Sequence, residues 1–123
     1  MPWRVTHLAD YNIIETTYTG EVTIEELQAA IMMNLKLASQ YKSRLYLGDC
    51  SGIRHQSSIQ EMRELAGYIQ HISADPQSKE AIILPISQKL INEIRDFDFP
   101  SHGKHYQFDI FSSRRKAIAW LIS

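Results

Sequence analysis

Hydrophobic and polar positions follow two different periods along the 123-residue chain. Runs rich in β-branched and aromatic residues predict five strands, at residues 3–8, 13–19, 44–50, 81–84 and 106–111. The run 81–84, Ala-Ile-Ile-Leu, is continuously apolar, which is typical of a central strand buried on both faces. Residues 9–12, Ala-Asp-Tyr-Asn, predict a tight turn, so the first two strands should form a hairpin.

Apolar residues at helical spacing predict four helices between and after these strands. Thr23 and Glu26 form a capping box in front of the first helix, which should end near Tyr41. Ser58 and Glu61 form a second capping box. Further serines, which are good N-caps, precede the other two helices, at Ser87 and at Ser112 or Ser113. The first helix has an apolar stripe made of Ile24, Leu27, Ile31, Leu35 and Ala38.

The resulting element order is β-β-α-β-α-β-α-β-α. Strands that alternate with helices indicate right-handed crossovers and mostly parallel pairing, and the opening hairpin adds one antiparallel neighbour. We therefore expect an α/β fold with a mixed sheet of about five strands. The length of the chain suits a single domain that covers residues 1–123.

Composition narrows the class of protein without naming a function. Hydrophobic residues make up 44% and charged residues 22%, as in ordinary globular proteins. A net charge of −1 gives no electrostatic footprint for nucleic acid. No apolar stretch approaches the roughly 20 residues that span a bilayer, and residues 1–6 do not resemble a secretory signal. The single cysteine, Cys50, allows no internal disulfide, so a cytoplasmic location is expected.

Four passages together resemble a known family. They are Tyr-Thr-Gly-Glu-Val-Thr at 18–23, Leu-Gly-Asp-Cys-Ser-Gly at 47–52, Ala-Ile-Ile-Leu-Pro at 81–85 and the segment 111–121. Their order and spacing resemble the STAS domain of bacterial anti-sigma-factor antagonists, in particular the small SpoIIAA-like proteins. The resemblance implies a regulatory module that binds a protein partner rather than an enzyme. No cofactor is expected, since the sequence has no phosphate-loop or dinucleotide motif. A homodimer is also compatible with it.

The resemblance also implies a phosphorylation switch. In the antagonists, a serine at the start of the second helix, in an Asp-Ser-Ser type of motif, is phosphorylated by the partner kinase. The matching residues are Gln56, Ser57 and Ser58, with Gln56 in place of the acidic residue and Ile59 in place of the usual glycine. A phosphate there would be favoured by the helix N-terminus and would add a charge of about −1.5 to −2. Alternatively, Ser58 is simply an N-cap.

A candidate binding site follows from the position of Asp49. We expect Asp49 to lie at the end of the strand 44–50, with residues 51–56 as a loop. Ligands of open α/β sheets bind beyond the carboxyl ends of parallel strands. The predicted partner, ligand or switch site therefore consists of Asp49, Ser51, His55, Ser57 and Ser58. The alternative is that the Asp49 carboxylate only accepts hydrogen bonds from loop amides.

Other chemistry has weaker support in the sequence. Asp49, His55 and a serine could suggest a hydrolytic triad, but no Gly-x-Ser-x-Gly elbow is present. His102 and His105 are too few to form a metal site by themselves. Cys50 lies beside Asp49, which should raise the pKa of the thiol, so we expect a small buried apolar residue. No catalytic residue and no metal ligand is predicted.

Three functional hypotheses remain open. The first is the non-catalytic interaction module. The second is a carrier of a small apolar ligand or lipid, because Met32, Met33 and Met62 lie on or near the helix stripes and methionine adapts to irregular ligands. The third is an unrecognised hydrolase. The basic run Arg-Arg-Lys at 114–116 opposes the dipole of the last helix, and it is either a solvated surface or a partner contact.

Overall fold

The computed structural model of the chain describes residues 3–53, 78–84, 87, 89, 92 and 107–123. The helix predicted at 58–72, most of the helix predicted at 87–94 and Tyr106 lie outside these residues.

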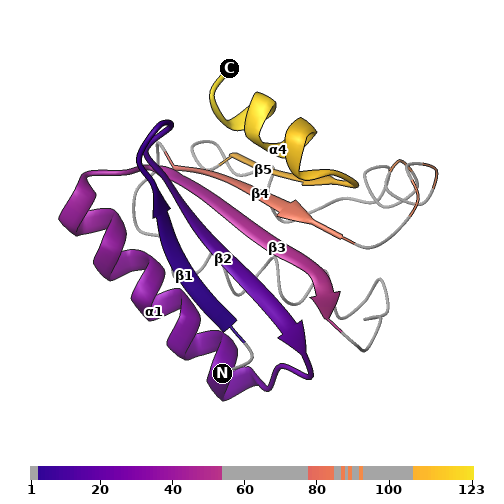
Figure 1. Cartoon of the computed structure of the whole chain (residues 1–123), viewed down its shortest axis with the longest axis horizontal. Coiled ribbons are helices and arrows are strands. Elements are labelled where there is room, and N and C mark those ends of the chain that lie inside the picture. Colours follow the sequence, from indigo (N-terminus) through magenta and orange to yellow (C-terminus); the bar gives the residue numbers. More distant parts are fainter. Residues whose placement is uncertain (1–2, 54–77, 85–86, 88, 90–91, 93–106) are drawn as a thin grey trace.

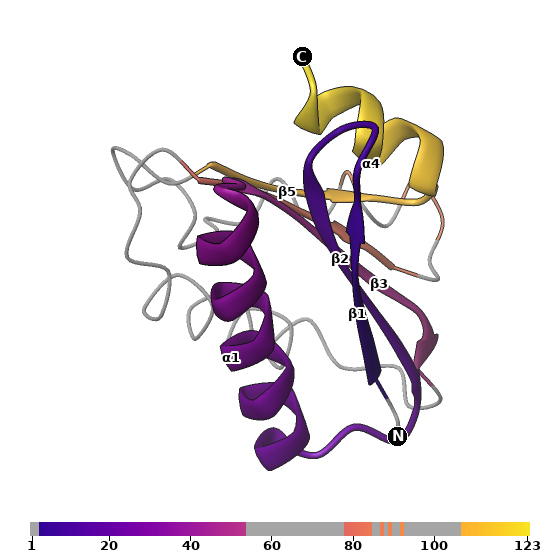
Figure 2. The ribbon, with the colours of Figure 1, turned by 60° about the vertical axis from the view of Figure 1, so that its left-hand side comes forward.

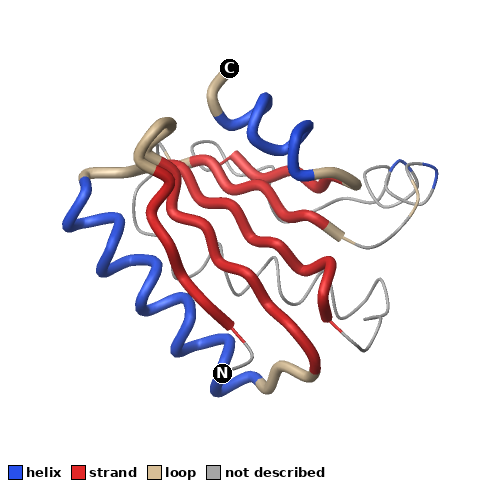
Figure 3. The backbone as a smooth tube through the Cα atoms, in the orientation of Figure 1, coloured by secondary structure: helices blue, strands red, loops and turns tan. Residues whose placement is uncertain are grey.

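The described strands form one twisted sheet in which each strand lies beside its neighbour in chain order (Figures 1 and 3). β1 pairs with β2 in antiparallel orientation, and all other pairs are parallel. The predicted mixed five-stranded sheet is therefore confirmed. The bounds of the strands are Trp3–Leu8 (β1), Ile13–Gly20 (β2), Leu45–Ile53 (β3), Lys79–Ile83 (β4) and Gln107–Phe111 (β5).

The two helices with described bounds, α1 (Ile24–Tyr41) and α4 (Arg114–Leu121), lie on opposite faces of the sheet (Figure 2). Thr23 caps α1 as predicted, because its side chain accepts a hydrogen bond from the Glu26 amide. On the reciprocal side of the capping box, Oε2 of Glu26 is buried without a hydrogen-bond partner. Ser113 caps α4 by accepting from the Lys116 amide.

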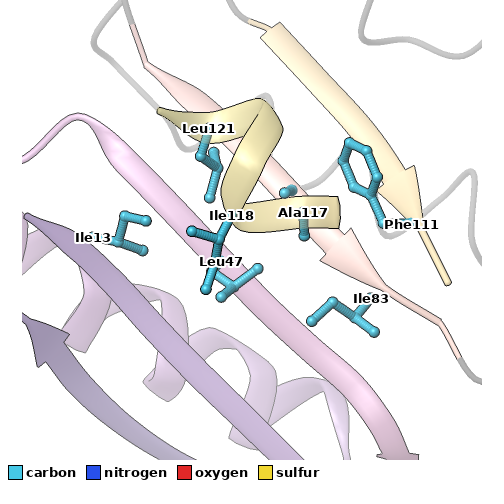
Figure 4. Close-up of a cluster of buried hydrophobic side chains, with 8 residues drawn as sticks. Ile13, Leu47, Ile83, Phe111, Ala117, Ile118 and Leu121 are labelled. Carbon is cyan, nitrogen blue, oxygen red and sulfur yellow. The ribbon is translucent and has the colours of Figure 1, made fainter. Parts of the chain in front are cut away.

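Each face of the sheet has its own apolar cluster. On the α1 face, Tyr18 and Cys50 pack with Ala30 of the helix. On the α4 face, the helix packs through Ala117, Ile118 and Leu121 on buried side chains of the strands (Figure 4). The strand residues of this second cluster are Ile13, Leu47, Ala81, Ile83 and Phe111. β4 is buried on both faces, as its continuous apolar run in the sequence predicted.

The length of β3 corrects the sequence-based prediction. We expected a loop from Ser51, but the strand continues to Ile53. The extension forms because Thr19 and Gly20 of β2 pair with Gly52 and Ile53. Asp49 consequently lies within β3, paired with Thr17 on one side and with Ile83 on the other, rather than at a strand end.

Within the part of the chain that the structure describes, no helix has both the length and the apolar character needed to cross a membrane.

Candidate functional site

The α4 face of the sheet changes from apolar to polar along β3. Side chains on one face of a strand recur every second residue. On this face β3 presents Leu45 and Leu47, which pack in the cluster beneath α4, and then Asp49. α4 packs on β3, β4 and β5, and its N-terminus lies near the carboxyl end of β5 (Figure 1). The polar part of the face therefore begins where the apolar cluster under α4 ends.

A β-bulge fixes the polar end of β3. Thr17 pairs with Asp49 and Thr19 with Gly52, so Cys50 and Ser51 together lie opposite the single residue Tyr18. Oδ1 of Asp49 accepts two hydrogen bonds from Ser51, one from its amide at 3.0 Å and one from its hydroxyl at 2.6 Å. Asp49 and Ile83 form the last β3–β4 pair. The Ser51 amide lies beyond this pair, and the Asp49 carboxylate is its hydrogen-bond acceptor. The Asp49 side chain accepts a hydrogen bond from a nearby backbone amide, which is the alternative role that the sequence suggested for it.

An ion pair joins α4 to β2 across the same face. Nε of Arg114 donates to Oε2 of Glu15 at 3.0 Å, and its Nη2 donates to Oε1 at 3.4 Å. The Glu15 side chain is only 11% exposed, whereas the Arg114 side chain is 51% exposed. The hydrogen bond to Glu15 raises the pKa of the Arg114 guanidinium, burial lowers it, and the charges of Glu15 and Asp49 raise it further. Arg114 thus interacts electrostatically with both Glu15 and Asp49.

Two residues of β1 extend the polar surface. Thr6 is paired with Glu15, and Arg4 is paired with Thr17. Residues directly opposite each other in an antiparallel pair lie on the same face of the sheet. Arg4 and Ser51 are exposed, while Thr6, Thr17 and Asp49 are half-buried. We call this surface the open face; it consists of Arg4, Thr6, Glu15, Thr17, Asp49, Ser51 and Arg114.

Only part of the predicted site can be placed in the structure. Asp49 and Ser51 are brought together, at hydrogen-bond distance. His55, Ser57 and Ser58 lie outside the described residues, as do His102 and His105. Among the residues that the structure describes, no group of at least three His, Cys, Asp or Glu side chains is arranged to hold a metal ion.

Cys50 is buried on the other face, in the cluster beneath α1. Burial, and to a lesser extent the nearby charges of Asp49 and Glu80, raise the pKa of its thiol to about 12. The predicted effect of Asp49 on the thiol is present, although burial contributes more. Because the thiolate is the nucleophile, a thiol with this pKa is inert at neutral pH.

The sequence reasoning missed Arg4, Thr6, Glu15 and Thr17. A signal for two of them was present, because Glu15 and Thr17 follow Ile13 at alternate positions of a strand. That alternation indicates a face that turns polar along its length. The ion-pair partner of Glu15 had no comparable signal, since Arg114 lies 99 residues further along the chain.

Comparison with known proteins identifies the fold. No protein-family model matches the sequence, and comparison with curated proteins gives no significant match. Among solved structures, the chain is similar to the crystal structure of an uncharacterized protein from the DUF3478 family, with a SpoIIAA-like fold, from Shewanella loihica PV-4. The TM-score is 0.53 at 18% sequence identity, and the match covers 97% of this chain and 91% of the other. The chain has a SpoIIAA-like fold, which confirms the resemblance that the four sequence passages indicated.

Proposed function

We propose that this protein is a non-catalytic interaction module that binds a protein partner through the open face. One observation supports this most directly: polar side chains of the open face are held in place by one another. Asp49 holds Ser51, and Arg114 holds Glu15. A surface whose hydrogen-bonding groups are already ordered loses less entropy when a partner binds, so it is suited to specific recognition.

The hydrogen bonds and the burial of the ionisable groups favour partner recognition over catalysis. Oδ1 of Asp49 is occupied by two hydrogen bonds from Ser51, and the Glu15 carboxylate accepts from Arg114. A catalytic acid or base has to lie within hydrogen-bond reach of the proton that it transfers. Cys50 is buried and has a raised pKa, which does not suit a nucleophile. These groups are better placed to orient a partner than to transfer a proton.

The proposed regulation is phosphorylation of Ser57 or Ser58. Both serines follow the end of β3 in the sequence, four and five residues after Ile53. A phosphate on either serine would add a charge of about −1.5 to −2 and would weaken binding of an acidic or apolar partner. This part of the proposal depends on residues outside the described ranges, and phosphomimetic variants test it.

The test is a quantitative pull-down from native lysate with purified wild-type protein and matched variants. Ser51→Lys places a long cation at an exposed position of the open face. Gln40→Lys makes a comparable change at an exposed position of α1, on the other face of the sheet. We expect Ser51→Lys to reduce capture of the specific partner by about tenfold, as for an interface residue worth ~1.4 kcal/mol, while Gln40→Lys captures as much as the wild type. Equal capture by both lysine variants would contradict the proposal.

Ser57→Asp and Ser58→Asp, measured in the same assay, test the regulatory part. Reduced capture by either variant supports the switch. If both variants capture normally while Ser51→Lys does not, the binding surface stands and the phosphorylation switch is rejected.

The two alternative functions gain no support from the described residues. Met32 and Met33 are 63% and 36% exposed on the outer surface of α1, so they do not line an interior ligand site. Met62 lies outside the described residues. For the hydrolase hypothesis, only Asp49 of the suggested triad is described, and its Oδ1 is bonded to Ser51. Esterase and phosphatase screening with Asp49→Asn as the control decides that hypothesis.

A further inference from the structure

The outer surface of α1 has an unusual composition for a solvent-facing helix. Residues 25, 29, 32 and 36 are spaced by four, three and four positions, so they form one stripe along the helix. All four are exposed, whereas Ala30, Ile31 and Ala38 on the inner side are buried. α1, which carries these residues, lies on the opposite face of the sheet from α4 (Figure 2). We call these four residues the α1 stripe.

The centre of the α1 stripe is apolar and its two ends have opposite charges. Met32, at the centre, is 63% exposed, and Met33 beside it is 36% exposed. Ala29 is the other central residue, and Glu25 and Lys36 are the ends. The outer face of a surface helix is ordinarily polar. Methionine is flexible and polarizable, which makes it well suited to packing against another helix.

Glu25 and Lys36 have no opposite charge within reach on their own helix. They are eleven positions apart, or about 16 Å along the axis at 1.5 Å per residue. The helix neighbours three and four positions from Lys36 are Met32, Met33, Ser39 and Gln40, all uncharged. Those that follow Glu25 at the same spacing are Gln28 and Ala29. Intrahelical ion pairs require a spacing of three or four, so Glu25 and Lys36 are both available to pair with charges outside α1.

We propose that α1 is the contact surface of a homodimer, in which it packs antiparallel to α1 of a second copy around a two-fold axis. With the axis at the level between Ala30 and Ile31, Glu25 faces Lys36 of the second copy and Ala29 faces Met32 of the second copy. The two-fold symmetry repeats both contacts. The small Ala29 side chain leaves room for the long Met32 side chain at the usual helix separation of about 8–10 Å.

Charge decides between the two possible orientations. In a parallel arrangement Glu25 would face Glu25 and Lys36 would face Lys36, which is repulsive. The antiparallel arrangement pairs each glutamate with a lysine and also places the helix dipoles head to tail. The same stripe is therefore complementary to itself in one orientation only, which makes a second copy a better occupant than an unrelated helix.

The dimer should be weak. α1 has 18 residues and is about 27 Å long, so a single pair of helices buries an area at the low end of specific interfaces. Such interfaces often dissociate at micromolar concentrations. Dimerisation should therefore be measured over a wide range, from about 1 µM to about 1 mM.

Sedimentation velocity of charge-reversed variants tests the pairing. We expect the wild type to dimerise as concentration rises. Lys36→Glu and Glu25→Lys each replace two attractive contacts by two repulsive ones, so each should raise the dissociation constant by at least about tenfold. The matched control, Arg115→Glu on the exposed surface of α4, makes the same charge change elsewhere and should dimerise like the wild type.

Mixing the two variants gives a result that misfolding cannot imitate. An equimolar mixture of Lys36→Glu and Glu25→Lys should form a heterodimer, because each variant then presents the charges that the other needs. The double variant Glu25→Lys/Lys36→Glu should dimerise by itself, since both its ion pairs are restored in reverse. A wild-type protein that is monomeric at every concentration, or a dimer unaffected by either reversal, overturns the proposal. Single variants that stay apart when mixed also overturn it.

Discussion

The α4 face of the sheet has two parts that share the same strands and serve different purposes. Beneath α4, Leu47, Ile83 and Phe111 are packed with the helix, and Leu47 is only 1% exposed. Two residues beyond Leu47 on β3, the face turns polar at Asp49. The apolar part derives its stability from burial, which is insensitive to direction. The open face instead has directional hydrogen bonds and ion pairs, which are suited to specific contacts. Changes in the first part should therefore affect folding, and changes in the second should affect binding.

The largest effect is expected in the apolar part. Leu47→Ala removes buried methyl groups from a close-packed cluster and should lower the free energy of unfolding by about 2–5 kcal/mol. Urea denaturation followed by circular dichroism measures the change. Thr17→Ala on the open face is the control and should change stability by well under ~1 kcal/mol. Similar losses in both variants would show that the two parts do not differ in the way we describe.

A smaller effect on stability is expected at the bulge that forms the boundary. A Cβ atom on Gly52 would lie 2.9 Å from the Tyr18 carbonyl oxygen. That oxygen belongs to the backbone of β2, so Gly52→Ala should push the two strands apart and cost about 1–3 kcal/mol. Ser51→Ala, one residue earlier, lacks this clash and should cost clearly less. If Gly52→Ala leaves the free energy of unfolding unchanged in the same denaturation experiment, the close approach of β2 to Gly52 is refuted.

Alkaline pH should destabilise the protein through buried groups on the α1 face. Burial, together with the charges of Asp49 and Glu80, raises the pKa of the Cys50 thiol from an ordinary value of 9.0 to about 12 in the folded state. Burial also raises the pKa of Tyr18. The unfolded chain therefore loses these protons first, so stability is complete below about pH 9 and falls as pH rises toward 12. Unfolding titrations at several pH values should show a shallower decline for Cys50→Ala than for the wild type.

Thiol labelling provides a second measurement of the same burial. In the native protein at pH 8, Cys50 should react slowly with a thiol reagent and should react fully after denaturation. Fast labelling of the folded protein would contradict the buried position of the thiol.

The smallest effect on stability is expected from the ion pair on the open face. Arg114→Ala removes the partner of Glu15, but the guanidinium is half exposed, so solvent screening limits its contribution. A loss of about 1 kcal/mol is expected, part of which comes from leaving the Glu15 carboxylate without its cation. Arg115→Ala, at the next position of the same helix turn, should leave the stability unchanged. Thermal unfolding of the two variants distinguishes these outcomes.

Within the described residues, the sequence predicted the periodic parts of the fold well. Strand and helix periods and serine or threonine caps are local signals, and Thr23 and Ser113 both act as the caps that were expected. The continuation of β3 was missed because Ser51 and Gly52 are poor strand formers. Their strand conformation depends on pairing with Thr19 and Gly20, which is a tertiary contact.

The candidate site was predicted only in part for the same reason. Asp49 and Ser51 are two residues apart, so their hydrogen bond is local and accessible to sequence reasoning. The pairing of Glu15 with Arg114 is created by the fold, because β2 and the start of α4 meet only when the sheet has assembled. The charged run at 114–116 was noted in the sequence, but nothing local indicated that its first member would pair across the sheet.

The most direct test of the division between the two parts is an NMR titration of isotope-labelled wild-type protein with the partner that the pull-down identifies. We expect chemical-shift changes in the amides of Asp49–Gly52 and Ser113–Arg115, with little change at Leu47, Ile118 or Leu121. That result would place binding on the open face and leave the apolar part as support. Shift changes confined to the α1 stripe, with none at Asp49–Gly52, would contradict the account.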